Sequence, residues 1–258
     1  MHRAEHYLSG LLPVNANKAT VLARVLTPQE AAIVSTALPV DANDYFYSAC
    51  MSVLDGLRAI EVGFYTWSTV KMYYALFYAV RAILAWDNTA VFRIGGRTPF
   101  SIRAANGSLP EFIPGRGSHK SMLNCFRNRL PAHFLLSQPI EAVDGPAWLL
   151  EKREQANYAI PRFCEPGVPE HYEQIFRIGV RKAIVEYLNP SGSILTFDKD
   201  HAVVSYPLAA LRSAADSAKL HGGAIIEPAE KQFLIKKCQE RSAVLAPMMT
   251  FLRGSIRK

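Results

Sequence analysis

The clearest pattern in the chain is an apolar run between Tyr65 and Leu84 that repeats at helical spacing. Apolar side chains occupy almost every face of this run, which predicts a helix buried in a bundle. One stripe is different, because charged and phenolic side chains follow one another at spacings of three, four and three residues: Lys71, Tyr74, Tyr78 and Arg81. Residues at these spacings share one helix face. We therefore expect this stripe to meet other helices through hydrogen bonds, or to line a cleft for an anionic or aromatic ligand.

The segment before this helix predicts two further helices. Thr27, Pro28 and Glu30 form a capping box with Pro at the first helical position, which predicts a short helix that ends before Pro39. A second helix is expected after the capping residues around Asp41, with a stripe of apolar residues at Phe46, Cys50, Val53, Leu57 and Ile60. A tight turn near Gly63 then predicts an antiparallel pair with the 65–84 helix.

The second half of the chain alternates helical patterns with breakers. Pro169 opens a long predicted helix that ends at Asn189. Residues 194–197 and 202–206 flank a polar turn, and this arrangement predicts a small hairpin. Helices are then expected from Pro207 and from Glu227 onwards.

A long connection between Asn88 and Gly117 coincides with a surplus of positive charge. Residues 88–133 contain a single acid, Glu111, against seven cations, in a chain of net charge +7: Arg93, Arg97, Arg103, Arg116, Lys120, Arg127 and Arg129. A local basic patch is suited to a phosphate-rich partner. The alternative is a solvated loop whose charges pair with acids from elsewhere in the fold.

Composition narrows the class of protein. The 258 residues are 50% hydrophobic and 20% charged, which predicts a globular chain of one domain with additions, or of two small domains. The N-terminal residues lack the layout of a signal peptide, and Lys71 and Arg81 interrupt the best candidate for a membrane span. The four cysteines are scattered without metal-ligand spacing. We expect a cytoplasmic protein with no membrane contact, no metal and no cofactor.

Part of the chain, from about residue 44 to 188, resembles the HEPN superfamily of helical-bundle domains. The family's second-helix pattern is matched at nine positions: Ser68, Tyr73, Tyr74, Ala75, Phe77, Ala79, Arg81, Ala82 and Leu84. Two later segments match in order, 118–121 and 150–158, with Asn157 where the family has Asp. The resemblance implies an all-α protein: an antiparallel HEPN-like bundle over 44–189, helical extensions at 1–43 and 190–258, and one small hairpin. It also implies a homodimer.

Catalytic HEPN proteins are metal-independent ribonucleases whose signature is Arg, a polar residue, and His after four to six residues. Arg127, Asn128 and His133 fit this spacing, although Pro131 lies where the family has helix. Such an Arg stabilises charge on a phosphate, and such a His moves the proton of a ribose 2′-hydroxyl. The resemblance therefore implies a candidate ribonuclease site at these three residues.

A second candidate site lies on a later helix, at Arg153, Asn157 and Tyr158. In the branch that the chain most resembles, the corresponding helix keeps its Arg but lacks the His, and such members are non-nucleolytic or act through partners. For Arg153 we expect a structural bridge to Tyr74 or Glu154.

A third candidate is an anion site at a helix N-terminus, where free backbone N–H groups attract negative charge. His119 lies there beside Arg116 and Lys120.

The residues and the resemblance together leave two functions open. The first is a module that binds RNA, a nucleotide or a partner protein through the basic loop and the Lys71–Arg81 stripe, in a prokaryotic defence or toxin–antitoxin system. The alternative is a metal-independent endoribonuclease that uses Arg127 and His133.

Overall fold

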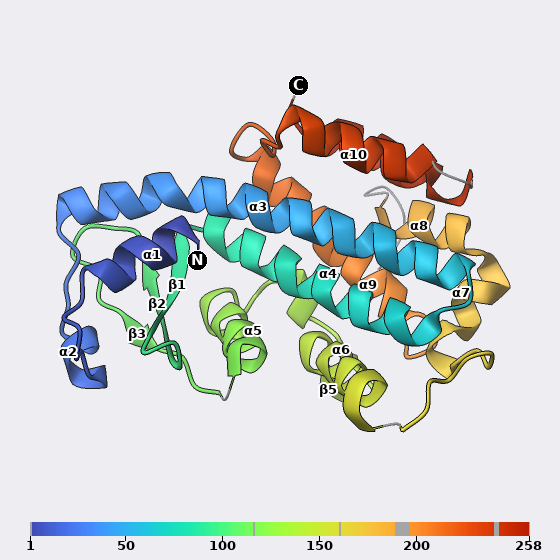
Figure 1. Ribbon diagram of the computed structural model, residues 1–258, viewed down its shortest axis with the longest axis horizontal. Helices are drawn as coiled ribbons and strands as arrows, with labels where there is room; N and C mark the ends of the chain where they lie inside the picture. Colours follow the sequence, from blue (N-terminus) through green and yellow to red (C-terminus); the bar gives the residue numbers. More distant parts are fainter. Residues whose placement is uncertain (1, 116, 160, 189–196, 240–242, 258) are drawn as a thin grey trace. The chain divides into compact units, whose positions relative to one another are not determined.

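The chain is mostly helical, with a few short strands (Figure 1). The computed structural model describes residues 2–115, 117–159, 161–188, 197–239 and 243–257. The protein divides into two compact units: the first comprises Met1–Tyr45 and Val80–Pro131, and the second comprises Phe46–Ala79 and Ala132–Lys258. The predicted division into 1–43, 44–189 and 190–258 stays a prediction, and its second boundary falls outside the described residues.

Two long helices contribute to both units: α3, Pro28–Glu61, and α4, Tyr65–Trp86. The predicted start of α3 is confirmed, since the Glu30 N–H donates to Thr27 Oγ1 at 3.3 Å and the Thr27 N–H donates to Glu30 Oε2 at 2.9 Å. The prediction that this helix ends before Pro39 is wrong, because α3 continues through the proline. A proline inside a helix removes one hydrogen bond and costs about 3 kcal/mol. Val34, Leu38 and Ala42 are all buried around it, and their burial offsets that cost.

In the first unit, two short helices precede α3, and a sheet and one helix follow α4. The helices are α1, Arg3–Gly10, α2, Lys18–Leu22, and α5, Gly117–Arg129. The antiparallel sheet consists of β1, Thr89–Ile94, β2, Thr98–Arg103, and β3, Glu111–Phe112. The three strands lie within the connection between Asn88 and Gly117 that was expected to be a long loop.

The β1–β2 hairpin is fixed by its turn and by its apolar face. Gly95 and Gly96 both have positive φ, which only glycine adopts readily and which lets the chain reverse tightly. Phe92 and Phe100 are paired across the strands, with ring centroids 5.7 Å apart, and both rings are buried. This aromatic pair sets the register and buries one face of the sheet.

In the second unit, the α3 and α4 segments lie antiparallel and side by side (Figure 1). Phe46, Val53, Leu57 and Ile60 of the predicted stripe are buried as expected. A Cβ on Gly56 would lie 3.0 Å from the Met72 side chain, so the two helices approach closely at this glycine.

The remaining helices of the second unit follow in chain order. They are α6, Gly145–Glu154, α7, Glu173–Ile178, α8, Val180–Leu188, α9, Ala202–Lys219, α10, Pro228–Gln239, and α11, Ala246–Ser255. A two-stranded ribbon, β4, Pro139–Ile140, and β5, Val143–Asp144, precedes α6. A π-helical turn at Gln155–Ala159 directly follows α6, and 3-10 turns lie at Phe134–Leu136, Glu170–Tyr172 and Ala243–Leu245.

Two predictions for this half of the chain are wrong. The 202–206 segment is helical, because α9 begins at Ala202 and continues through Pro207. The 194–197 strand of the same hairpin falls mainly on residues outside the described ones. The helix expected from Pro169 to Asn189 is divided at Gly179, whose φ of 88° ends α7 before α8 begins.

Candidate functional site

The α4 stripe makes specific contacts in both units. In the second unit, Lys71 Nζ lies 2.9 Å from Asp55 Oδ2, and the rings of Tyr74 and Tyr78 stack with centroids 6.2 Å apart. In the first unit, Arg81 donates to the Tyr45 hydroxyl at 2.6 Å and lies 4.0 Å from the centre of that ring. The stripe therefore meets another helix, α3, by polar contacts, as the first of the two expected roles requires.

Arg81 and Tyr45 also line a cavity in the first unit, but that cavity has a volume of only about 20 Å³. A water molecule needs about 10–15 Å³ of such space. The cavity has room for a water molecule and not for an organic ligand.

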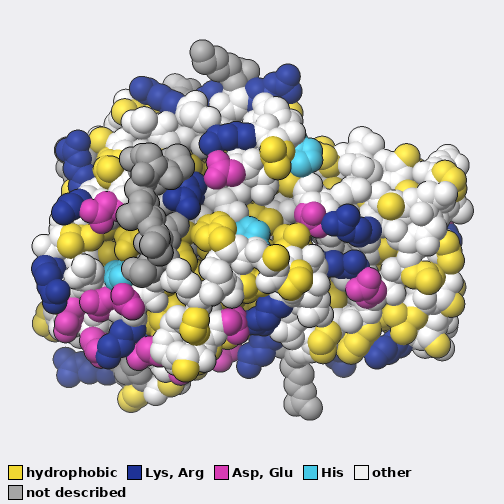
Figure 2. Space-filling view, turned by 180° about the vertical axis from the view of Figure 1, so that it is seen from behind, with side chains coloured by type: hydrophobic (Ala, Val, Ile, Leu, Met, Phe, Trp, Pro, Cys, Tyr) yellow, Lys and Arg dark blue, Asp and Glu magenta, His cyan; other side chains and the backbone are white. Residues whose placement is uncertain are grey.

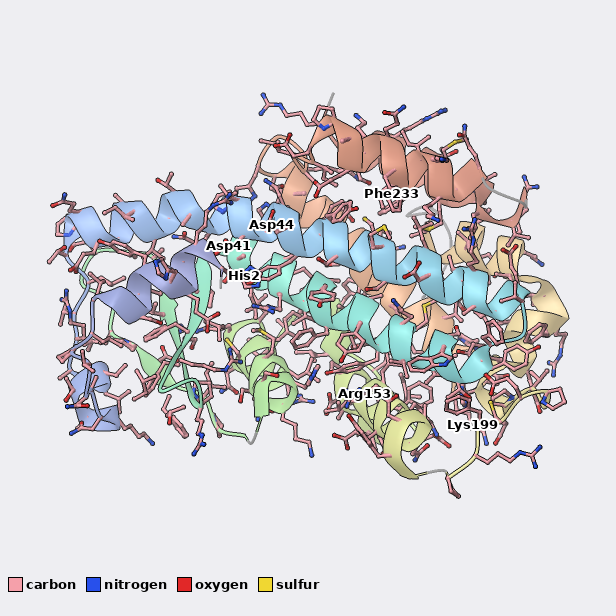
Figure 3. The ribbon with its side chains drawn as sticks, in the orientation of Figure 1. His2, Asp41, Asp44, Arg153, Lys199 and Phe233 are labelled. Atoms are coloured by element: carbon pink, nitrogen blue, oxygen red, sulfur yellow. The ribbon has the colours of Figure 1, made fainter. Side chains whose placement is uncertain are left out.

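Arg153 lies on α6 (Figure 3), and its guanidinium is surrounded by tyrosines. Its Nη2 lies 3.4 Å from the Tyr74 hydroxyl, so the expected bridge to Tyr74 forms. The guanidinium carbon lies 5.3–5.8 Å from the ring centres of Tyr73, Tyr74 and Tyr158, and no described carboxylate forms an ion pair with it. Asn157 lies half-buried in the π-helical turn. The structure therefore brings Arg153 and Tyr158 together as part of an aromatic cluster.

Half of the described cations between residues 88 and 133 pair with carboxylates. Arg93 lies 3.4 Å from Glu5, and Arg103 lies 2.8 Å from Asp87, both acids being outside that segment. Arg129 lies 3.1 Å from Glu111. In the view of Figure 2, basic side chains are likewise interspersed with acidic ones. These pairs reduce the net charge of the expected basic patch.

The other cations of this segment differ in their surroundings. Arg97 and Lys120 are exposed, and Arg127 donates to Asn124 Oδ1 at 2.6 Å. His119 lies half-buried in the first turn of α5. Arg116 falls outside the described residues. The anion site expected at this helix start therefore retains Lys120 as its exposed cation among the described residues.

The candidate ribonuclease residues are divided between the units. Arg127 and Asn128 belong to the first unit, and His133 belongs to the second. His133 Nδ1 accepts from the Leu135 N–H at 3.2 Å, and its Nε2 lies 2.9 Å from Ser213 Oγ. Burial lowers the pKa of His133 from 6.5 to about 4. This histidine therefore caps a 3-10 turn as a neutral imidazole, and catalysis by these residues stays a prediction.

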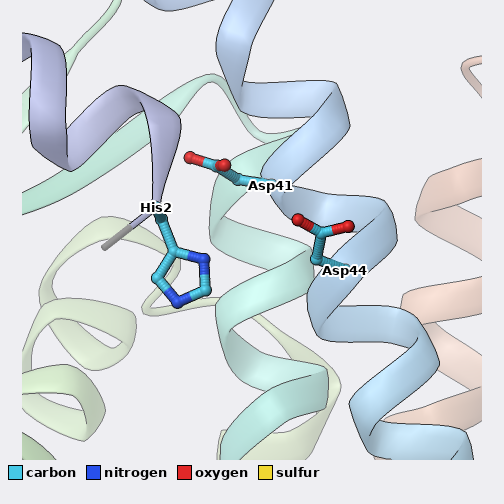
Figure 4. Close-up of side chains that lie close together, drawn as sticks. All are labelled: His2, Asp41 and Asp44. Carbon is cyan, nitrogen blue, oxygen red and sulfur yellow. The ribbon is translucent and has the colours of Figure 1, made fainter.

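His2, Asp41 and Asp44 approach one another in the first unit (Figure 4), with ligand atoms within 4.8 Å. Both oxygens of Asp41 already accept hydrogen bonds at 2.9 Å, from the N–H groups of Arg3 and Ala4 at the start of α1. Burial, and then the charge of Arg81, lower the pKa of His2 to about 4. The Asp41 carboxylate therefore caps α1, and the positive charge of Arg81 lies close to the cluster.

The second unit contains a pocket of about 90 Å³ beside α4 and α6, which we call the α4–α6 pocket. Its lining residues come from three separate stretches of chain: Thr66 and Thr69; Lys152, Gln155 and Ala156; and Arg162, Phe163, Cys164, Pro169 and His171. Of the residues that the structure describes, two cations line it and no carboxylate does. Its walls combine cationic, hydroxyl and aromatic groups.

The two cations of the α4–α6 pocket are held differently. Lys152 lies 3.7 Å from Glu141 and 5.1 Å from the centre of the Trp148 ring, with 22% of its side chain exposed. Arg162 is exposed and has no ion-pair partner among the described residues. Arg162 is thus the more available of the two for an anionic ligand.

His171 lines the α4–α6 pocket and contacts Thr69. Its Nε2 lies 3.3 Å from Thr69 Oγ1, and the same hydroxyl donates to the Tyr65 carbonyl at 3.0 Å. Burial, and next the charge of Lys152, lower the pKa of His171 from 6.5 to about 4. The imidazole is therefore neutral at pH 7.

Cys164 also lines the pocket, and both its thiol and the neighbouring Glu165 carboxylate contact Thr66. Glu165 accepts from the Thr66 N–H at 2.8 Å and from the Thr66 hydroxyl at 2.7 Å. Burial raises the pKa of Glu165, but these hydrogen bonds outweigh burial and hold the pKa below its usual value. Burial raises the pKa of the Cys164 thiol, which lies 3.2 Å from Thr66 Oγ1. The thiol is therefore protonated at neutral pH rather than a nucleophilic thiolate.

Two exposed aromatic side chains lie at the edge of the α4–α6 pocket. Phe163 lines it and is 55% exposed, and Trp67 is 50% exposed with its ring centroid 6.0 Å from that of Phe163. Exposed apolar groups of this size, placed together, are typical of binding surfaces. This site was not predicted from the sequence, although Arg162 and Phe163 between Pro161 and Pro166 are a local signal of a basic and aromatic turn.

Comparison with known proteins finds no matching family model, no similar curated protein and no similar solved structure. In the part of the chain that the structure describes, no helix has the length and apolar character needed to cross a membrane.

Proposed function

We propose that the protein is a HEPN-like module that binds single-stranded RNA through the α4–α6 pocket. The observation that carries this proposal is the placement of Lys152 and Arg162 beside the exposed rings of Trp67 and Phe163. Proteins that bind single strands combine cations, which contact the phosphates, with aromatic rings, on which the bases stack. Both kinds of group occur here within one small area.

The chemistry of the α4–α6 pocket favours binding over catalysis. A metal-independent ribonuclease needs a group that moves a proton near neutral pH. His171 is kept neutral by burial, and its Nε2 lies beside Thr69 Oγ1. Cys164 is kept protonated by burial. The pocket therefore has groups for holding a strand, and these two side chains are poorly placed to cut it.

The HEPN assignment, the homodimer and a role in a prokaryotic defence or toxin–antitoxin system are part of the same proposal. They are supported by the sequence pattern of α4 and by the mostly helical fold.

The proposal is tested by fluorescence anisotropy of a labelled single-stranded RNA. We expect Lys152→Ala and Arg162→Ala each to weaken binding about fivefold to tenfold, because each removes a cation that neutralises a phosphate. The slope of log K against log salt should become shallower by about 0.7 for each phosphate that is no longer neutralised. Lys219→Ala is the matched control, since this lysine is exposed on α9 and pairs with Asp216 in the same unit.

The proposal is wrong if the wild-type protein does not bind RNA at low salt. It is also wrong if Lys219→Ala weakens binding as much as Arg162→Ala does, because the RNA would then be held by the charge of the whole protein rather than by the pocket.

A further inference from the structure

The shape and polarity of the α4–α6 pocket indicate which part of an RNA strand enters it. A volume of about 90 Å³ is well below the roughly 300 Å³ at which pockets hold a whole small ligand. One chemical group of the strand therefore fits inside, and the rest must lie outside.

The surroundings of His171 and Thr66 are unfavourable for a phosphate. His171 is neutral, and the carboxylate of Glu165 lies directly behind Thr66. Ala156, Pro169 and the ring of Phe163 contribute apolar wall. A neutral flat ring suits such walls better than a charged phosphate monoester or diester does, because burying an unpaired charge is costly.

The exposed side chains at the pocket are favourable for a phosphate and for a second base. Arg162 is exposed there without a described ion-pair partner, so it can reach a phosphate that remains in water. The half-exposed ring of Trp67 lies next to Phe163 and offers a flat surface outside the pocket. Stacking on such rings is tolerant of sequence, whereas an enclosed pocket selects by size.

We infer that the α4–α6 pocket takes one unstacked pyrimidine base, with its phosphate on Arg162 and the neighbouring base on Trp67. This inference rests on the proposed function and adds a preference to it: a single ring enters, and the larger fused ring of a purine is disfavoured. A free pyrimidine nucleotide would present the same base and phosphate, so the experiment includes it.

The test compares labelled oligo-U, oligo-C and oligo-A of about ten nucleotides, a length within the usual site sizes of single-strand binders. We expect oligo-U or oligo-C to bind about tenfold more tightly than oligo-A. Ala156→Leu places a larger side chain in the pocket. It should abolish the preference, because it weakens the binding of oligo-U and oligo-C and leaves the binding of oligo-A unchanged. Ala159→Leu is the matched control, because Ala159 lies exposed in the same π-helical turn.

The outcomes separate the two proposals. If all strands bind equally and Ala156→Leu changes nothing, while Arg162→Ala still weakens binding, the pyrimidine inference is wrong and the RNA-binding proposal stands. If no strand binds the wild-type protein, both are wrong. Competition by uridine monophosphate as effective as that by oligo-U, abolished in Ala156→Leu, supports the pyrimidine site and identifies the free nucleotide as its ligand.

Discussion

Gly145, the first residue of α6, offers a sharp test of how this helix packs against α9 in the second unit. A Cβ built on Gly145 would lie 2.4 Å from Cε2 and Cζ of Tyr206 and 2.7 Å from its hydroxyl oxygen. Carbon atoms in contact are normally about 3.5–4.0 Å apart. Gly145→Ala therefore requires α6 or the tyrosine ring to move by about 1 Å.

The tyrosine cannot move freely. Its ring is fully buried and packs edge-on against Phe197 with centroids 4.9 Å apart, and its hydroxyl donates to the Leu135 carbonyl. Overpacking of a filled core costs about 1–3 kcal/mol, and this contact belongs near the upper end of that range. For a chain of this size, about 2–3 kcal/mol corresponds to a fall in Tm of roughly 4–12 °C.

Thermal unfolding followed by circular dichroism measures this shift. The matched control is Gly254→Ala on α11 of the same unit, where a Cβ would meet no atom within 4 Å. That substitution should leave Tm unchanged or raise it slightly, because alanine favours a helix by up to about 1 kcal/mol over glycine. Equal Tm values for Gly145→Ala and the wild type would refute the described approach of α6 to Tyr206.

Three further predictions concern the other polar groups described above. Asp41→Ala removes the carboxylate that accepts from two N–H groups of α1, so it should cost about 1 kcal/mol and speed hydrogen exchange in α1; unchanged exchange would contradict the capping role. The unfolded chain binds a proton at His171 with the ordinary pKa of 6.5, whereas the folded protein does so at about 4. Stability from this group is therefore complete above about pH 6.5 and falls as the pH decreases towards 4, and urea midpoints measured over that range should show a smaller fall in His171→Gln than in the wild type. Finally, we expect no cleavage of labelled RNA in the presence of EDTA, because His133 acts as a neutral cap; cleavage by the wild type that disappears in both Arg127→Ala and His133→Ala would establish the ribonuclease alternative.

Local signals in the sequence predicted those helix ends that are fixed by capping residues close by in the chain. The reciprocal hydrogen bonds of Thr27 and Glu30 depend only on residues three apart, so the start of α3 was readable from the sequence. The buried face of α3 was predicted because its amphipathic spacing indicates which side of the helix meets the core, and the burial of α4 was predicted because almost every face of it is apolar.

Tertiary packing overrode local signals elsewhere. Pro39 was expected to end a helix, but the buried residues on both sides of it keep α3 continuous. The segment Ala202–Tyr206 is buried on every side within α9, so it shows no helical period and resembles a buried strand. Neither outcome could be known without the neighbouring elements.

The candidate site was the least predictable part, because its residues are far apart in sequence. Thr66 and Cys164 are 98 residues apart, and Thr69 and His171 are 102 residues apart, yet each pair is in contact. The charge surplus at 88–133 was a stronger signal in the sequence, but a carboxylate such as Glu5, 88 residues from Arg93, reaches it only through folding. Counting charges along a chain does not show which of them are already paired.

The discontinuous make-up of the two units limits how the protein can be divided for study. The chain passes from one unit to the other after Tyr45, after Ala79 and after Pro131, and the first two passages fall inside α3 and α4. A fragment that ended at Pro131 would contain the whole first unit, but it would also carry residues 46–79 without the rest of the second unit. The apolar side chains buried there would then be open to solvent, and such a fragment would tend to aggregate. Domain-by-domain expression, the usual route for a protein with two units, is therefore unsuited to this chain, and point substitutions in the full-length protein are the better approach.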